Sequence, residues 1–189
     1  LESKAGCILV PLSYRNIDPY LTEGKTILYC ESPFHAMIQL LEEFTPKANT
    51  QKTIHPTAII HESAIIEGDI EEHAHIGPHC VIMAGSLIEA GAILEANVTI
   101  YPGVIIGEQC IIQAGAVIGP RGFGFYEHHG MQKPIPHFGG TTIGAHSSIG
   151  ANSVVAAGFI EPTEIGAYCH LDSFVQVGHN TTIGDDCFM

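Results

Sequence analysis

Basic residues and large aromatic side chains are scarce in this 189-residue sequence. Lysine and arginine together number 7 against 20 aspartate and glutamate residues, which gives a formal net charge of −13. A surface this acidic repels phosphate groups, which argues against nucleic acid or an anionic membrane surface as the main partner. Tryptophan is absent and aromatic residues make up only 7% of the chain. The apolar content is therefore mostly aliphatic, which suits a narrow and regular core.

Long apolar runs are also missing. No stretch reaches the roughly 18 uninterrupted apolar residues that a membrane-spanning helix requires. The first residues, LESK, do not form the apolar segment of a signal peptide. We therefore expect a soluble, cytoplasmic protein.

The six cysteines include no Cys-x-x-Cys pair, which is the spacing typical of redox and zinc sites. Four of them follow an aliphatic residue by four positions, where sister segments carry Ala, Ser or Val. Reduced cysteine is among the most buried residue types. These four are predicted to be small core residues: Cys80, Cys110, Cys169 and Cys187.

An aliphatic residue returns at every sixth position over residues 70–118. This period fits neither a helix, which repeats near 3.6 residues, nor a flat strand, which repeats near 2. Three sixes per turn are typical of a parallel β-helix with a triangular cross-section. The nine positions are Ile70, Ile76, Ile82, Ile88, Leu94, Ile100, Ile106, Ile112 and Ile118. We predict a mainly β fold whose β-helix covers residues 54–189.

The period fails at three places. Two are ten-residue steps, from Ile66 to Ile76 and from Val155 to Ile165, which we interpret as four-residue excursions at an edge of the coil. The third is a loop insertion at residues 119–142, which holds two Phe residues between glycines. Loops of this length are usually functional or disordered, and the aromatic pair favours function. Glycine directly after many of the periodic aliphatic residues is expected to permit a tight turn.

Residues 1–45 do not share the period. Two short strands are predicted at residues 5–11 and 25–30, followed by a helix that begins at Pro33. Because two strands and a helix bury little apolar surface, we expect this segment to be the C-terminal part of an α/β domain. Residues 46–53 are predicted to be a linker. The sequence as a whole is expected to be part of a longer protein.

Histidine is frequent, with twelve residues, and most are expected to be solvated surface side chains. His73, His75 and His79 are close enough in sequence to suggest zinc, but the His-x4-His pair of zinc-binding β-helix carbonic anhydrases is absent. His179 is the better candidate for chemistry, because a neutral imidazole can take a proton from an attacking amine or hydroxyl. Asp172 lies upstream and is a candidate to orient it. From spacing alone, a surface role for His179 without catalysis stays open.

Three segments carry a resemblance to a known family, and they occur in the same order. They are GFGF at residues 122–125, IGAN at residues 149–152 and LDSFVQVGHN at residues 171–180. They resemble the signature of the UDP-3-O-acylglucosamine N-acyltransferases, hexapeptide-repeat acyltransferases of lipid A biosynthesis. Residues 5–11 and 54–58 are similar to the same family. The resemblance implies a left-handed β-helix and assembly as a homotrimer.

The resemblance also implies an activity. The expected reaction moves a 3-hydroxyacyl chain from acyl carrier protein to the 2-amino group of UDP-3-O-acylglucosamine, with no metal or other cofactor. His179 matches the general base, and Asp172 matches the acidic position upstream of it. Substrate binding is expected at Phe123, Phe125, Gln176 and Asn180. Residues 1–45 would then belong to a nucleotide-sugar-binding domain.

Other functions are compatible with the repeats. A related hexapeptide acyltransferase could act on another nucleotide sugar, with acyl-CoA as donor. A non-catalytic β-helix used for assembly, or a zinc-binding β-helix, would carry the same period.

Overall fold

The computed structural model describes residues 4–15, 24–43 and 52–189. The chain divides into two compact units, Leu1–Thr45 and Pro46–Met189. Most of the linker predicted at residues 46–53 lies outside the described residues. In the parts of the chain that the structure describes, no helix is long and apolar enough to span a membrane.

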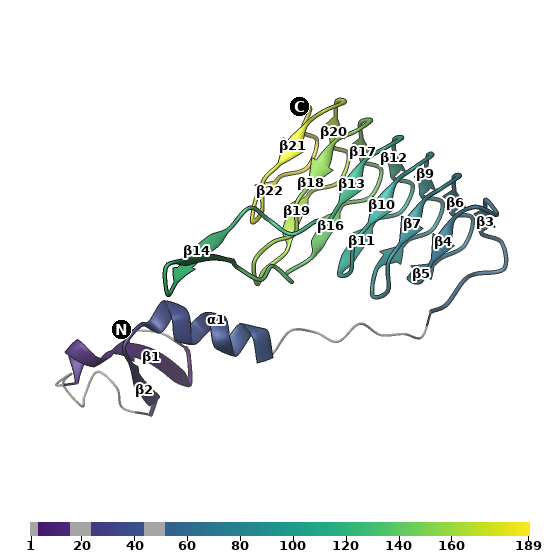
Figure 1. The fold of residues 1–189 in the computed structure, drawn as a ribbon. Helices are drawn as coiled ribbons and strands as arrows, with labels where there is room; N and C mark the ends of the chain where they lie inside the picture. The colour runs from purple at the N-terminus through teal and green to yellow at the C-terminus, as the bar shows by residue number, and fades with distance from the viewer. Residues whose placement is uncertain (1–3, 16–23, 44–51) are drawn as a thin grey trace. The chain divides into compact units, whose positions relative to one another are not determined.

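The first unit contains two parallel strands and a helix (Figure 1). Strand β1 (Cys7–Pro11) pairs in parallel with β2 (Thr26–Cys30), and a short 3-10 helix, η1 (Leu12–Tyr14), follows β1. Helix α1 (Pro33–Glu43) begins at the predicted proline, and the Oγ of Ser32 accepts the backbone N–H of His35 at 3.4 Å. Ile38 on α1 is fully buried.

The second unit is a column of coils whose short strands form three parallel sheets of six strands each (Figure 1). The first sheet contains β3 (Ile59–Ile60), β6 (His75–Ile76), β9 (Ile93–Leu94), β12 (Ile111–Ile112), β17 (Ser148–Ile149) and β20 (His170–Leu171). The second contains β4 (Ile65–Ile66), β7 (Val81–Ile82), β10 (Thr99–Ile100), β13 (Val117–Ile118), β18 (Val154–Val155) and β21 (Gln176–Val177). The third contains β5 (Asp69–Ile70), β8 (Leu87–Ile88), β11 (Val104–Ile106), β16 (Thr141–Ile143), β19 (Thr163–Ile165) and β22 (Thr182–Ile183). The chain visits the sheets in turn, so the predicted mainly β fold with a parallel β-helix is confirmed, and the coils are consistent with the expected left-handed winding.

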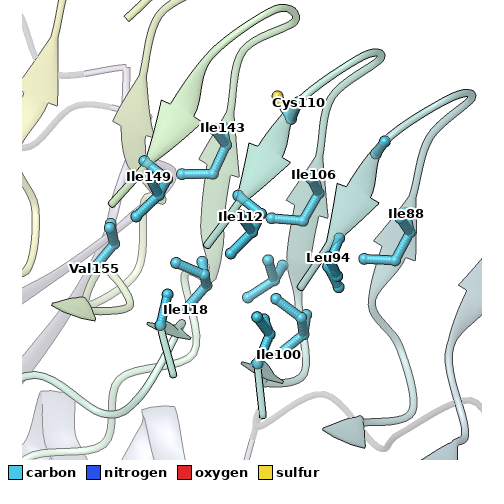
Figure 2. Packing of buried hydrophobic residues seen from close by; sticks show 14 of the residues in the cluster. Ile88, Leu94, Ile100, Ile106, Cys110, Ile112, Ile118, Ile143, Ile149 and Val155 are labelled. Carbon is cyan, nitrogen blue, oxygen red and sulfur yellow. The ribbon is translucent and has the colours of Figure 1, made fainter. Parts of the chain in front are cut away.

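The six-residue period is the spacing of the buried side chains. From β5 to β21, the last residue of every coil strand is buried, and Figure 2 shows core side chains packed inside the column. The residue two positions earlier also points inward and is small in most coils. Three of the four repeat cysteines occupy this position fully buried, and Cys187 is half-buried. Burial raises the pKa of the Cys110 thiol to about 11, so the thiol stays protonated and unreactive.

The turns between strands are made by a different residue from the one predicted. The left-handed backbone conformation falls three positions after the buried aliphatic, as at His73 (φ 56°), His79 (φ 58°) and Asn180 (φ 58°). Glycine directly after the aliphatic meets another constraint, because a Cβ on Gly77 would lie 2.8 Å from the carbonyl oxygen of Glu95 in the next coil. These glycines therefore serve the close stacking of coils, and the turn itself uses His, Asn, Gly or another residue.

Acidic side chains satisfy backbone N–H groups at the turns. The carboxylates of Glu71, Glu89 and Glu95 accept the N–H of a residue in the next coil, at 3.1, 3.1 and 3.0 Å respectively. Each carboxylate directly follows a buried aliphatic residue. Part of the acidic excess of the chain is thus structural, since an ionised carboxylate is the stronger acceptor for an N–H group.

One predicted excursion is wrong. Ile70 belongs to the ladder, with 2% of its surface exposed, and it pairs with Ile88 in the third sheet. The chain therefore passes from Ile66 to Ile70 with only two residues between strands β4 and β5, a connection shortened by two residues. Gly68 makes this possible, because its backbone lies directly against Ser86, where a Cβ would overlap. The second ten-residue step, from Val155 to Ile165, is a true excursion between β18 and β19.

All irregular connections occur at one edge of the triangular column. We call it the loop edge, the edge at which the chain passes from the second sheet to the third. It carries the short β4–β5 connection, the insertion after β13 and the step after β18. The insertion contains an antiparallel hairpin, β14 (Phe125–His128) and β15 (Met131–Pro134), which projects from the coils in Figure 1.

Candidate active site

The insertion and the step after β18 are joined by backbone hydrogen bonds along the loop edge. The N–H of Phe138 donates to the carbonyl of Phe159 at 3.1 Å, and the N–H of Gly139 donates to the carbonyl of Gly158 at 3.0 Å. A Cβ on Gly139 or Gly158 would overlap the backbone carbonyl of Glu161. Glycine at both positions is what allows the two segments to pack this closely.

Asn180 ties the step after β18 to the next coil. Its Oδ1 accepts the N–H of Phe159 at 3.0 Å, and its Nδ2 donates to the carbonyl of Glu161 at 3.5 Å. Its own backbone N–H donates to Oγ1 of Thr163 at 2.9 Å. Because an N–H group must meet an acceptor, these contacts fix which atom of the amide is oxygen.

His179 lies beside this amide, exposed at the loop edge between β21 and β22. Its Nδ1 is 2.9 Å from Oδ1 of Asn180. Since an amide oxygen can only accept, the Nδ1 carries a proton in this contact and Nε2 of the neutral ring keeps its lone pair. The arrangement leaves Nε2 available to take a proton from another molecule.

A second imidazole, which the sequence did not single out, packs against His179. The rings of His137 and His179 lie edge to face with their centroids 4.7 Å apart, and His137 also meets the ring of Phe159 at 5.7 Å. Nδ1 of His137 is 2.9 Å from the carbonyl oxygen of Ile135, so Nδ1–H is the donor there. His137 falls in the aperiodic insertion, where the six-residue pattern cannot place a side chain.

The electrostatic setting of His137 favours its neutral form. Burial is the largest cause and lowers the pKa of His137, while the carbonyl of Ile135 opposes the change. The positive charge of Arg121, and a charge on His179 whenever that ring is protonated, lower the pKa of His137 further.

The segment of the insertion that carries two Phe side chains passes close to the two histidines at Gly122. Gly122 packs so closely that a Cβ there would be 2.7 Å from the His137 ring and 2.7 Å from Cβ of His179. The following Phe123 is 87% exposed and meets the ring of Phe125 edge to face at 5.2 Å. The guanidinium of Arg121 lies 5.8 Å from the centre of the Phe125 ring. The segment that packs against the candidate base through Gly122 therefore carries an exposed aromatic pair and a cation.

The other predicted site residues do not all meet at His179. Asp172 lies on the far side of strand β21, at the connection between the first and second sheets, and its Oδ1 accepts the adjacent N–H of Ser173 at 2.7 Å. Within one chain, the structure does not bring Asp172 to His179. Gln176 is exposed on the outward face of β21, three residues before His179. Asn180, predicted to bind substrate, uses both polar side-chain atoms within the chain.

The early histidines are spread around the column. His73 and His79 form turns on either side of β6, and His75 points outward from that strand. Among the described residues, no three His, Cys, Asp or Glu side chains are grouped so as to hold a metal ion.

Two family models match the repeats. The bacterial transferase hexapeptide model matches residues 85–120, and the hexapeptide repeat of succinyl-transferase matches residues 140–173.

Curated relatives share a name as well as sequence. A UDP-3-O-acylglucosamine N-acyltransferase of Pseudomonas aeruginosa (strain LESB58) is 41% identical over 202 aligned positions, which cover the whole of this chain and 56% of that protein. A protein of the same name from Ectopseudomonas mendocina (strain ymp) is 42% identical over 92 residues, 49% of this chain and 26% of its own length. Even in the longer of these two alignments, this chain covers little more than half of the relative's length.

Solved structures share the coil architecture. LpxA from Acinetobacter baumannii superposes with a TM-score of 0.53 at 27% identity, covering 70% of this chain and 48% of that one. The UDP-N-acetylglucosamine O-acyltransferase of Moraxella catarrhalis RH4 gives a TM-score of 0.53 at 30% identity, covering 71% and 49%.

Proposed function

We propose that the chain is a hexapeptide-repeat acyltransferase, as its matches to two repeat models and to the curated relatives suggest, and that it transfers a 3-hydroxyacyl group from acyl carrier protein to the 2-amino group of UDP-3-O-acylglucosamine. The observation that carries this proposal is the setting of His179. Its Nδ1–H donates to Asn180, its Nε2 has no hydrogen-bond partner among the described residues, and two exposed Phe rings lie on the neighbouring insertion. An amine that attacks a thioester requires such a base beside an apolar surface for the acyl chain.

In the proposed reaction, bonds and protons balance between the two substrates and the imidazole of His179, and the donor that stabilises the oxyanion of the tetrahedral intermediate is a further requirement. The sugar amine forms a C–N bond to the thioester carbonyl carbon, and Nε2 of His179 takes the amine proton. The C–S bond then breaks, and the imidazolium returns the proton to the leaving thiolate. Asn180 keeps the imidazole in the tautomer that can accept the proton, and a positive charge on the ring strengthens the hydrogen bond to its Oδ1.

The substrate contacts are proposals of the same kind. Phe123 and Phe125 are proposed to line the path of the acyl chain, because both are exposed aromatic side chains on the segment that packs against the base through Gly122. Gln176 is proposed to bind the sugar, since it is exposed on the strand that leads to His179. Residues 1–45 are proposed to be part of a nucleotide-sugar-binding α/β domain.

Assembly as a homotrimer and a cytoplasmic location complete the proposal. The outward row of the second sheet is apolar and β-branched over most of its length, as at Ile65, Val81 and Val117, which favours side-by-side packing of columns. The separation of Asp172 from His179 within one chain fits a site shared between copies. Acyl carrier protein and nucleotide sugars are cytoplasmic substrates, which supports the proposed location.

The test is an acyl-transfer assay of the full-length protein with a 3-hydroxyacyl carrier-protein thioester and UDP-3-O-acylglucosamine. His179→Ala should lower the rate by about 10²-fold or more. His61→Ala, at an exposed histidine near the start of the column, should leave it unchanged. UDP-N-acetylglucosamine, which offers a hydroxyl, serves as the second acceptor because of the O-acyltransferase among the structural relatives. Transfer to that acceptor alone would replace the proposed reaction, and a normal rate for His179→Ala would remove His179 from its role.

A further inference from the structure

The base mechanism requires one imidazole, yet the structure places two in direct contact. His137 belongs to the return limb of the insertion, and His179 belongs to a regular coil turn more than forty residues later in the chain. They meet because the insertion, the step after β18 and the β21–β22 turn are stacked along the loop edge and joined by hydrogen bonds.

His137 is itself held from several sides. Its Nδ1–H donates to Ile135, its ring meets Phe159, and its opposite edge faces Gly122. A ring with this many constraints presents a fixed surface to the imidazole of His179. Edge-to-face contacts between aromatic rings at this separation are favourable beyond the burial of apolar surface, so this contact favours one orientation of the His179 ring, which is otherwise exposed.

We propose that His137 is a positioning residue for His179, which together with Asn180 clamps the imidazole so that Nε2 faces the substrate side. This inference rests on the proposed function and adds a residue to it. Asn180 fixes the tautomer through a hydrogen bond, and His137 fixes the plane of the ring through its contact. We call His137 and Asn180 the clamp. Gly122 packs against the ring of His137 and Cβ of His179, so the segment that carries Phe123 and Phe125 lies directly against the clamped residue.

The neutral state of His137 suits this role. Burial first, and then the positive charge of Arg121 and a charge on His179 whenever that ring is protonated, lower the pKa of His137. The charged groups on the neighbouring segments are Arg121 on the outgoing limb, Glu161 on the step after β18 and His179 on the last regular turn. When His179 takes a proton during the reaction, His137 therefore stays uncharged and does not repel it.

The first test observes the imidazole without any substrate. NMR of the full-length protein labelled with 13C at histidine Cε1 should show His179 as a single neutral tautomer above pH 7. In His137→Ala, we expect a mixture of tautomers or a broadened signal, because the ring can then rotate. In His137→Phe, which retains a ring against His179 and Phe159, the single tautomer should persist.

The second test separates positioning from folding. His137→Ala should lower kcat about tenfold with KM changed less than about twofold, since misalignment affects the reacting geometry more than substrate binding. His137→Phe should restore kcat to within about threefold of the wild type. Unchanged kcat and tautomer in His137→Ala would overturn the inference. Equal losses in both variants, with the His179 signal unaltered, would also overturn it, because His137 would then act through its own nitrogen atoms.

The two proposals fail in distinguishable ways. If the protein transfers no acyl group at all but the His179 signal responds to His137→Ala and is rescued by His137→Phe, the clamp stands and the reaction must be another. If transfer occurs and the signal never responds, the reaction stands and the clamp does not.

Discussion

The backbone N–H of Phe159 donates to Oδ1 of Asn180 across 3.0 Å, and the same oxygen lies 2.9 Å from Nδ1 of His179. One amide oxygen thus joins an irregular connection to the candidate base. Removing this oxygen should therefore affect both the step after β18, through Phe159, and the tautomer of the His179 ring.

Asn180→Ala should lower kcat by about tenfold or more, because the tautomer of His179 is no longer fixed and the Phe159 N–H loses its partner. Asn180→Asp should behave differently. A carboxylate beside Nδ1 stabilises the imidazolium, so the acid limb of kcat/KM should move to higher pH. A pH–rate profile distinguishes the two variants, and an unshifted acid limb in Asn180→Asp would show that this side chain does not contact the base in solution.

Gly122→Ala should impair catalysis because a Cβ at this position would lie 2.7 Å from both histidines. Overpacking of this kind typically costs about 1–3 kcal/mol, and here the strain falls on the clamp. We expect kcat to fall about tenfold, as for a base misplaced by a fraction of an ångström. Gly184→Ala is the matched control, since a Cβ there meets nothing within 4 Å. Similar kinetics for the two variants would contradict the packing described for Gly122.

Arg121 should contribute to binding of an anionic substrate. Among the described residues of the second unit the basic side chains are Lys52, Arg121 and Lys133, and two of these three lie on the insertion. In a chain of net charge −13, this is where a diphosphate or an acidic carrier protein would meet least repulsion. Arg121→Glu should raise KM about tenfold at low salt, with a smaller effect at high salt. Lys52→Glu is the control, and an equal rise in KM there would point to a general charge effect.

The insertion should become less stable as the pH falls. Because the pKa of His137 is lowered from its ordinary value of 6.5 in the folded protein, the unfolded chain binds a proton first as the pH drops below 6.5. The stability that His137 contributes is complete above that pH and is lost progressively below it. Hydrogen exchange of the insertion amides at pH 7.5 and 5.5 measures this loss. His137→Gln should show a smaller pH dependence, and an identical dependence would exclude His137 as its origin.

The repeat architecture was predictable because its signal is periodic. The aliphatic residue at every sixth position identified the core, and the burial of three of the four repeat cysteines followed from the same spacing. Where the period changed, prediction was weaker. Ile70 fits both a six-residue and a four-residue step, and only the pairing with Ile88 shows that the connection after Ile66 is short.

The candidate site was predictable only in part. His179 stands in a recognisable motif, but its partners come from aperiodic segments, and no spacing rule places His137 or Phe159 against it. Gly139 and Gly140 were the available signal, since paired glycines often mark a close backbone approach. Asp172 was predicted to orient His179 within one chain because the two residues are close in sequence. Each six-residue segment covers one side of the triangular coil, so the two side chains lie at different edges of the column.

The concentration of irregular connections at the loop edge makes the column modular. Strand β16 pairs with β11 as if the intervening segment were an ordinary turn, because Ile143 stacks directly on Ile106. At the two other edges, the connections between successive coil strands from β3 to β22 all have the same length, whereas the connections at the loop edge differ in length. Loops of different length and chemistry could be grafted after Ile118 without altering a single pairing in the three sheets. A change of specificity in such a protein would then require new sequence at one edge only, and the three sheets would keep their shape.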